Sequence, residues 1–243
     1  MKIKFLVLFL FGLSLIVSCR KDNVEKIETE VEDEFWIELR IPEQKKGVSA
    51  IYGSIEDTLV IATHNKIYQT TNQGKSWVNV YNTALGISGF SVFKGELLAH
   101  SNFGDYASSP FLFSLDHGKT WSRKSKYDYL VYDQIRVSRE VISINDQKQF
   151  KIKSQPDKIN DEDYNRPLRQ PDKLIQVYKG NETLVYFPYE RDLNCLYLDV
   201  NHRIYIGAEG TQFAWSSKNN VRTYPTHTDA AIIYISKLPV GQF

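Results

Sequence analysis

The chain has 243 residues, 42% of them hydrophobic and 13% aromatic, which is enough for one large or two small domains with a sizeable core. Its 30 basic and 29 acidic residues leave a formal net charge of +1. This balance argues against a nucleic-acid partner, which requires a strongly basic face. The 15 tyrosines and 13 phenylalanines recur in short runs with Ile, Val and Thr, a pattern that favours strands over helices.

Residues 1–18 have the pattern of a secretory signal peptide. Lys2 and Lys4 precede an apolar stretch, 5–17, which is too short for a bilayer span of about 20 residues. The stretch runs into Ile-Val-Ser-Cys at 16–19, which resembles the lipobox of bacterial lipoproteins. The resemblance implies cleavage before Cys19, lipidation of Cys19 and membrane anchoring in the cell envelope, on the outer membrane or cell surface or facing the periplasm. An ordinary signal peptide with a chance cysteine is the alternative.

Residues 19–34 follow as the lipidated cysteine and a charged segment. The segment is rich in acids and has no aromatic side chain, so it can bury little surface and predicts a solvated tether. The second of the two cysteines, Cys195, lies in an apolar run at 193–198. We expect it to be a small buried residue of a strand rather than half of a disulfide.

The remaining chain, 35–243, contains an internal repeat. The octapeptide TTNQGKSW stands at 70–77 and SLDHGKTW at 114–121. Each follows two strand-like segments, 59–62 with 66–69 and 96–99 with 111–113. A degenerate third copy, 217–224, follows 204–207 and 214–216 and lacks the glycine. Segments 140–143 and 149–152 have the strand pattern without the octapeptide, and the polar stretch 158–173 reads as a loop insertion.

The shared pattern, Ser/Thr-x-Asp/Asn-x-Gly-x-Ser/Thr-Trp, is similar to the Asp-box, or BNR repeat, of the sialidase-like superfamily. The resemblance implies an all-β fold, a β-propeller of four-stranded antiparallel blades. The length of the chain predicts about four to five blades, in a closed or an incomplete ring. The residues of the boxes are Thr70, Asn72, Gly74, Ser76, Trp77, Ser114, Asp116, Gly118, Thr120, Trp121, Ser217, Asn219, Thr223 and Tyr224.

The residue types of the octapeptide predict a structural role. Asp116 and Asn72 can accept hydrogen bonds from nearby backbone N–H groups and close an Asx-type turn. The glycine supplies a positive φ, and the tryptophan starts the outer strand and packs inward. We therefore expect Asp116→Ala to lower thermal stability without affecting binding. Segment 35–39 is expected to close the ring by pairing with 230–235.

The resemblance implies a ligand face opposite the boxes, which would be formed by the loops between second and third strands, namely 64–65, 100–110, 144–148 and 208–212. The alternative for these loops is an ordinary solvated turn. The five histidines are dispersed and have no metal-ligand spacing, so we expect neither a metal nor a cofactor. The candidate ligand-face residues are Arg40, His64, His100, Asp105, Tyr106 and Glu209.

Leu39-Arg40-Ile41-Pro42 resembles the Phe/Tyr-Arg-Ile-Pro motif of sialidases, where the arginine binds a sugar carboxylate. The other sialidase features, two further arginines and a Tyr–Glu pair, are not recognisable. We therefore expect a non-catalytic binding or scaffold module for a glycan or protein partner, anchored to the membrane by lipid. The alternatives are a sialidase-type glycoside hydrolase and an assembly factor for a membrane complex. The ligand and the oligomeric state stay open.

Overall fold

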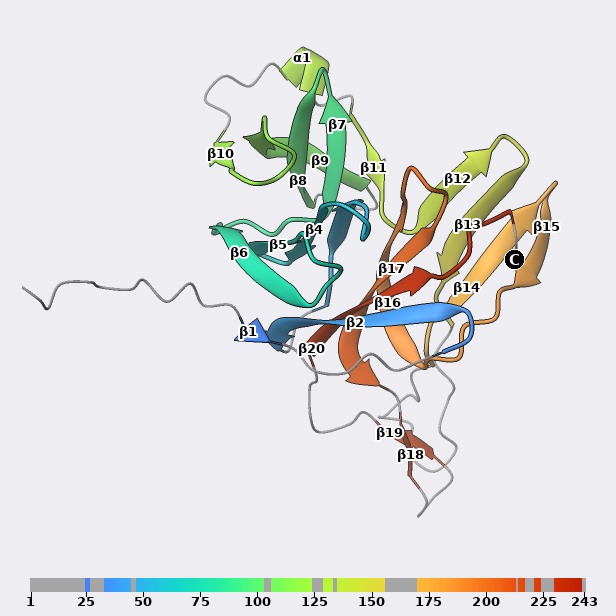
Figure 1. Cartoon of the computed structure of the whole chain (residues 1–243). Helices are drawn as coiled ribbons and strands as arrows, with labels where there is room; N and C mark the ends of the chain where they lie inside the picture. Colours follow the sequence, from blue (N-terminus) through green and yellow to red (C-terminus); the bar gives the residue numbers. More distant parts are fainter. Residues whose placement is uncertain are drawn as a thin grey trace, which may run out of the picture.

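The strands form four antiparallel sheets arranged around a common centre, in a four-blade β-propeller (Figure 1). The computed structural model describes residues 25–26, 33–44, 47–102, 106–123, 129–132, 135–155, 170–212, 214–216, 221–223 and 230–241. The expected all-β propeller is confirmed. It has four blades, the lower of the two numbers expected, four and five. Cys19 and the segment 1–18 lie outside the described residues. Within the described part of the chain, no helix has the length and hydrophobicity to cross a membrane.

Blades 1 and 2 are sequential meanders that contain the two octapeptides. Blade 1 consists of β3 (Ala50–Gly53), β4 (Leu59–Thr63), β5 (Lys66–Thr70) and β6 (Ser76–Asn82), with β1 (Glu25–Lys26) paired to β6. Blade 2 consists of β7 (Gly89–Phe93), β8 (Glu96–Asn102), β9 (Tyr106–Ser114) and β10 (Ser122–Arg123). The short α1 (Tyr129–Tyr132) follows, and β11 (Val137–Ser138) pairs with β9. The two residues of β1 belong to the predicted tether, so this part of it adds to a blade.

Blade 3 is a third meander, and blade 4 is completed by the N-terminal part of the chain. Blade 3 consists of β12 (Val141–Asn145), β13 (Lys148–Lys153), β14 (Lys173–Tyr178) and β15 (Asn181–Leu184). Blade 4 consists of β16 (Arg191–Leu198), β17 (Ile204–Gln212), β20 (Ala230–Ser236) and β2 (Trp36–Gln44). Ile37 of β2 pairs with Ile235 of β20, which confirms the expected closure of the ring.

Two strand assignments made from the sequence are wrong. Segments 140–143 and 149–152 correspond to β12 and β13, the first and second strands of blade 3, rather than the second and third. Loop 144–148 therefore lies at the same end of the ring as the octapeptides. The segment 214–216, expected as the third strand of blade 4, forms β18 (Ala214–Ser216), which pairs only with β19 (Val221–Thr223). Residues 221–223, the described part of the degenerate third copy, therefore belong to a strand outside the blade.

The alternation of antiparallel strands sorts the connections to two ends of the ring. One end, here the turn end, carries 54–58, 71–75, 94–95, 115–121, 146–147, 179–180 and 199–203. The opposite end, here the loop end, carries the connections between second and third strands, 64–65, 103–105, 154–172 and 213–229. The two longest connections within blades, 154–172 and 213–229, therefore both belong to the loop end.

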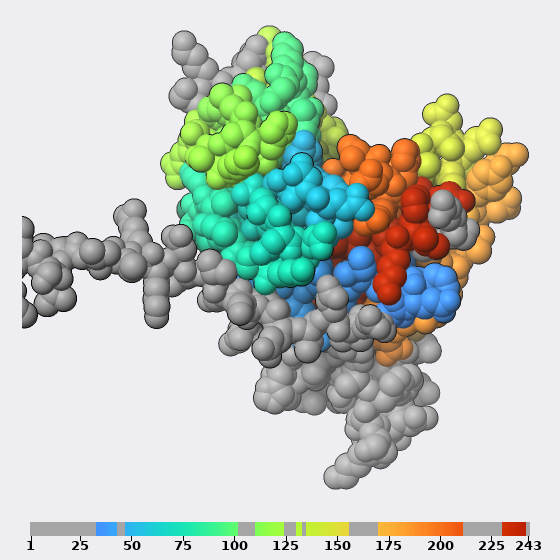
Figure 2. Space-filling view, viewed as in Figure 1, coloured from blue at the N-terminus to red at the C-terminus, as the bar shows by residue number. Residues whose placement is uncertain are grey.

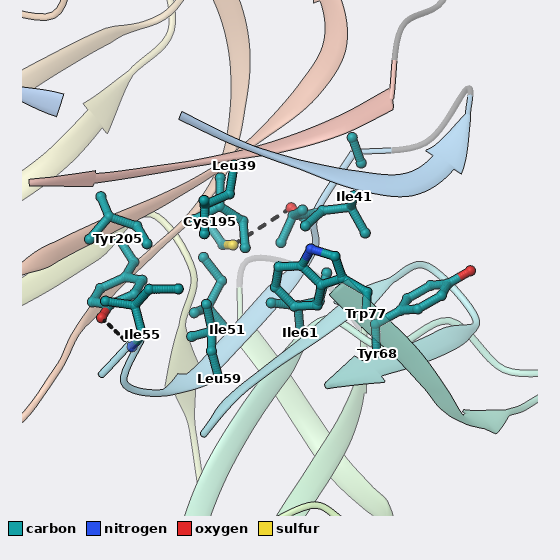
Figure 3. Packing of buried hydrophobic residues seen from close by; sticks show 14 residues of the cluster. Leu39, Ile41, Ile51, Ile55, Leu59, Ile61, Tyr68, Trp77, Cys195 and Tyr205 are labelled. Carbon is teal, nitrogen blue, oxygen red and sulfur yellow. Dashed lines mark hydrogen bonds between the residues drawn. The ribbon is translucent and has the colours of Figure 1, made fainter. Parts of the chain in front are cut away.

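Hydrophobic clusters fill three of the four spaces between neighbouring blades. Trp77 and Ile61 of blade 1 share the first cluster with Ile233 of blade 4 (Figure 3). A second cluster joins blades 3 and 4, and a third joins blades 1 and 2. Strand β20 contributes to two of them, because successive side chains point to opposite faces and its apolar run is buried on both.

The fourth space, between blades 2 and 3, is lined by polar groups on its blade 3 side. Phe150 belongs to the cluster shared with blade 4, so Lys151 and Lys153 point to the opposite face of the sheet. There both ammonium groups pair with Glu182, Lys153 at 2.7 Å. No hydrophobic cluster of the described residues joins these two blades, and in the view of Figure 2 the atoms of blade 2 (green) and blade 3 (yellow and light orange) stand apart, with orange atoms of blade 4 between them.

Candidate functional site

The octapeptide at 114–121 forms a closed hydrogen-bond network at the turn end of blade 2. Oδ1 of Asp116 accepts hydrogen bonds from Ser114 Oγ at 2.7 Å and from the Thr120 backbone N–H at 2.9 Å. Its Oδ2 accepts the Thr120 hydroxyl at 2.6 Å. The Gly118 N–H donates to Ser114 Oγ at 2.8 Å. The hydroxyl and backbone N–H of Thr120, followed by the Ser114 hydroxyl, lower the pKa of Asp116 to about 2.

The octapeptide at 70–77 repeats this network in blade 1 with an amide in place of the carboxylate. Asn72 Oδ1 accepts the Thr70 hydroxyl and the Ser76 backbone N–H, both at 3.0 Å. The Asn72 amide also donates to Ser76 Oγ at 2.8 Å, and the Gly74 N–H donates to Thr70 Oγ1 at 3.0 Å. The same geometry therefore forms with a neutral side chain, so the turn does not depend on a negative charge.

Each octapeptide also packs against the preceding blade of the ring. Gly118 has φ +90°, and a Cβ there would lie 2.6 Å from Val60 of blade 1. Gly74 has φ +80°, and a Cβ there would lie 2.9 Å from Leu39 in β2 of blade 4. Trp121 joins the cluster between blades 1 and 2, with its Nε1 donating to the Gly118 carbonyl at 3.0 Å. The octapeptides therefore hold neighbouring blades together.

Asp116→Ala is expected to lower the melting temperature, because it removes the acceptor of three donors within one turn. Asp116→Asn should lower it less, since Asn72 supports the same network in blade 1. The folded-state pKa is lowered, so the charge-dependent stabilisation is present above about pH 4 and is lost as the pH falls toward 2. Thermal unfolding between pH 5 and 2.5 should show the gap between wild type and Asp116→Asn narrowing, and a constant gap would contradict this.

Of the candidate ligand-face residues whose side chains are described, His64 and Glu209 are exposed near the loop end, whereas Arg40 and His100 lie elsewhere. His64 occupies the β4–β5 turn with φ 56° and is exposed at the loop end of blade 1. Glu209 of β17 is exposed near the loop end of blade 4. Arg40 lies in β2, the outermost strand of blade 4, where its Nη2 pairs with Glu38 Oε1 at 3.0 Å. Asp105 lies outside the described residues, as do Ser217, Asn219 and Tyr224, and only the backbones of Tyr106 and Thr223 are described.

His100 is fully buried in β8, so it does not reach the surface where a ligand was expected. Its Nε2 lies 2.7 Å from Ser91 Oγ, and its enclosed Nδ1 has no hydrogen-bond partner. Burial lowers the pKa of the imidazole to about 4, because desolvation opposes its charged form.

We expect the free energy of unfolding to fall by about 3 kcal/mol between pH 7 and pH 4 on account of His100. The folded-state pKa is lowered, so the stabilisation is complete above about pH 6.5 and is lost as the unfolded chain, but not the folded protein, takes up the proton. Urea unfolding of wild type and His100→Gln across this range measures the effect. His100→Gln should lose this part of the pH dependence, whereas exposed His117→Gln should keep it; equal slopes in all three proteins would contradict the assignment.

A cavity of about 350 Å³ lies at the centre of the ring and is lined by residues of all four blades. Its walls come from the innermost strands β3, β7, β12 and β16 and the adjoining segment 137–139. Its polar residues were not among the candidate site residues. A local signal existed in Val48-Ser49 and Ile87-Ser88, since in both an aliphatic–serine pair immediately precedes the first strand of a blade. Ser49 Oγ donates to the Ile87 carbonyl at 2.6 Å and thereby links two blades.

Cys195 lies in β16 against this cavity, buried as expected for a small core residue. Its thiol lies 3.6 Å from the Val48 carbonyl, and burial raises the pKa of the thiol to about 12. The thiol is therefore protonated at neutral pH and is not a nucleophile. Among the described residues, no group of three or more His, Cys, Asp or Glu side chains could hold a metal ion.

No family model and no curated protein matches this chain. Among solved structures, it is similar to the WD40 β-propeller domain of Doa1, with 7% identity over 86% of this chain and 98% of that chain and a TM-score of 0.37. It is also similar to a catalytically inactive virginiamycin B lyase from Staphylococcus aureus with quinupristin, with 11% identity over 84% and 99% and a TM-score of 0.31. The pairing of the strands by itself defines the four blades.

Proposed function

We propose that this protein is an envelope lipoprotein, anchored through Cys19, whose propeller is a non-catalytic binding or scaffold module for a glycan or protein partner. The observation that carries the binding part is the unequal build of the two ends of the ring. Tight turns pack against neighbouring blades at the turn end. The loop end carries the long connections 154–172 and 213–229. Rigid scaffolds that present long loops at one rim are a common basis of recognition.

The repeated octapeptides support membership of the Asp-box group of propellers. Their side-chain networks, positive-φ glycines and inward tryptophans agree with the residue types of that motif. Membership would relate the protein to the sialidase-like superfamily by fold, which by itself does not assign an activity.

The position of Arg40 favours binding over sialidase-type hydrolysis. A carboxylate-binding arginine of a central site should project from the inner strands, whereas Arg40 belongs to the outermost strand of blade 4. Its guanidinium is also bound to Glu38 on the same strand, Nε at 3.1 Å and Nη2 at 3.0 Å. The motif at 39–42 is therefore assigned to ring closure.

Membrane fractionation tests the anchor. The wild-type chain expressed with its N-terminal segment in a bacterial host should sediment with membranes and incorporate labelled palmitate. Cys19→Ser should do neither, and Cys195→Ser, which removes the other cysteine, should behave as wild type in both assays. Label in Cys19→Ser would contradict the proposal.

Binding is tested at the two ends of the ring with the same ligand screens. A glycan array and affinity capture from envelope extracts should both be run with wild type, with His64→Ala/Glu209→Ala at the loop end and with Lys75→Ala at the turn end. The proposal expects the loop-end variant to lose a ligand that the turn-end variant retains. Hydrolysis of an aryl sialoside, abolished by Arg40→Ala, would establish the enzyme instead, and co-purification of one fixed membrane complex would favour an assembly factor.

A further inference from the structure

The residues that line the central cavity include one cationic residue, the half-buried Arg139, for which the described residues provide no counter-ion. Arg139 stands between β11 and β12 and lines the cavity. Its Nε is enclosed and makes no hydrogen bond, and no ion pair joins its guanidinium to any carboxylate in the described part of the chain. An enclosed donor without a partner is destabilising, and more so when the group is charged.

The walls beside Arg139 offer both polar and apolar contacts. The backbone carbonyl of Arg139 is held by the Leu196 N–H at 2.6 Å, so the residue is fixed to the wall formed by β16. Its positive charge acts on the Cys195 thiol, which places the guanidinium within electrostatic reach of that wall. Ser88 and Ser143 also line the cavity. The apolar wall is formed by Phe90, Ile142 and Leu196.

These features point to a small anion with an apolar part. A guanidinium fork matches the two oxygens of a carboxylate, and such charge-assisted hydrogen bonds are stronger than those between neutral groups. Arg139 is the only Lys or Arg among the residues that line the cavity, which suits a monoanion better than a dianionic phosphate. The volume of about 350 Å³ lies at the small end of the range for ligand pockets.

We propose that the central cavity binds a small organic monocarboxylate, with its carboxylate on Arg139, its apolar part against Phe90 and Ile142, and further polar groups on Ser88 or Ser143. This site is separate from the loop-end surface of the proposed function, so the two proposals fail independently. No short sequence motif reveals the site, because Ser88, Arg139 and Leu196 lie more than 50 residues apart in the chain.

Calorimetric titration of the purified full-length chain with benzoate, mandelate and hexanoate tests the site. At least one acid should bind. The affinity of its uncharged amide should be lower by about tenfold or more, since one charge-assisted hydrogen bond corresponds to roughly that factor. Arg139→Gln should lower the affinity for the acid by about the same factor or more. Arg123→Gln, which changes an exposed arginine outside the cavity, should bind as wild type.

The melting temperature of the ligand-free protein provides a second readout. Arg139→Gln should melt at or above the wild-type temperature, because it removes an enclosed Nε–H donor that has no hydrogen-bond partner in the described protein. A lower melting temperature would show that Arg139 is a structural residue and would overturn the proposal. So would failure of all three acids at millimolar concentration, equal binding of acid and amide, or tighter binding of phenyl phosphate than of benzoate.

Discussion

Trp36→Ala is expected to lower the free energy of unfolding by about 3–5 kcal/mol, the range for loss of a large buried aromatic side chain. Trp36 is fully buried in the cluster between blades 3 and 4 and opens β2, the strand that completes the ring. Its Nε1 donates to the Tyr186 carbonyl at 3.1 Å, and its ring meets Phe187 edge to face with centroids 5.3 Å apart. One substitution therefore removes packing and a hydrogen bond where β2 pairs with β20 and closes the ring.

Urea unfolding followed by tryptophan fluorescence and circular dichroism measures this loss. Trp36→Phe should lose less, because the ring packing is partly kept, and Val200→Ala should be within about 0.5 kcal/mol of wild type, since Val200 is 84% exposed. A loss below about 1 kcal/mol for Trp36→Ala would mean that β2 contributes little to the ring.

Gly118→Ala should destabilise the protein more than Gly95→Ala, by about 1–3 kcal/mol. Both glycines have positive φ, +90° and +80°, so both substitutions incur the left-handed backbone cost of about 1–2 kcal/mol. They differ in their surroundings. A Cβ at 95 meets nothing within 4 Å, whereas a Cβ at 118 would lie 2.6 Å from Val60 in the neighbouring blade.

The pair therefore separates the conformational role of the glycine from its packing role. Chemical denaturation of both variants under the same conditions gives the difference directly. Val60→Ala in the Gly118→Ala background should recover part of the loss, because it removes the methyl group that clashes. Equal destabilisation by the two glycine substitutions would indicate that the octapeptide forms a turn without joining the blades.

The interfaces between blades also differ in a way that bears on the proposed ligand site in the central cavity. Three hydrophobic clusters join blades 2, 1, 4 and 3 in that order, while the face of blade 3 toward blade 2 carries the Lys151, Lys153 and Glu182 group. Arg139 follows β11 in the chain segment that connects these two blades. The charged residue of the cavity thus belongs to the side of the ring that lacks an apolar cluster.

The sequence alone was sufficient for features that arise within a few residues or from the apolar pattern of a whole strand. The octapeptide turns could be predicted because Ser114, Asp116, Gly118 and Thr120 meet one another inside a single turn. The closure of blade 4 could be predicted because 35–39 and 230–235 are both apolar runs without a nearby partner in the chain.

Features that depend on which strands become neighbours were decided only by the tertiary structure. The two-residue period is the same for every strand, so it could not show that β12 and β13 are first and second in their blade or that β20, rather than 214–216, is third in blade 4. Likewise, His100 is buried because of what packs over β8. Arg139 meets the other walls of its cavity only because four inner strands from distant parts of the chain converge at the centre of the ring.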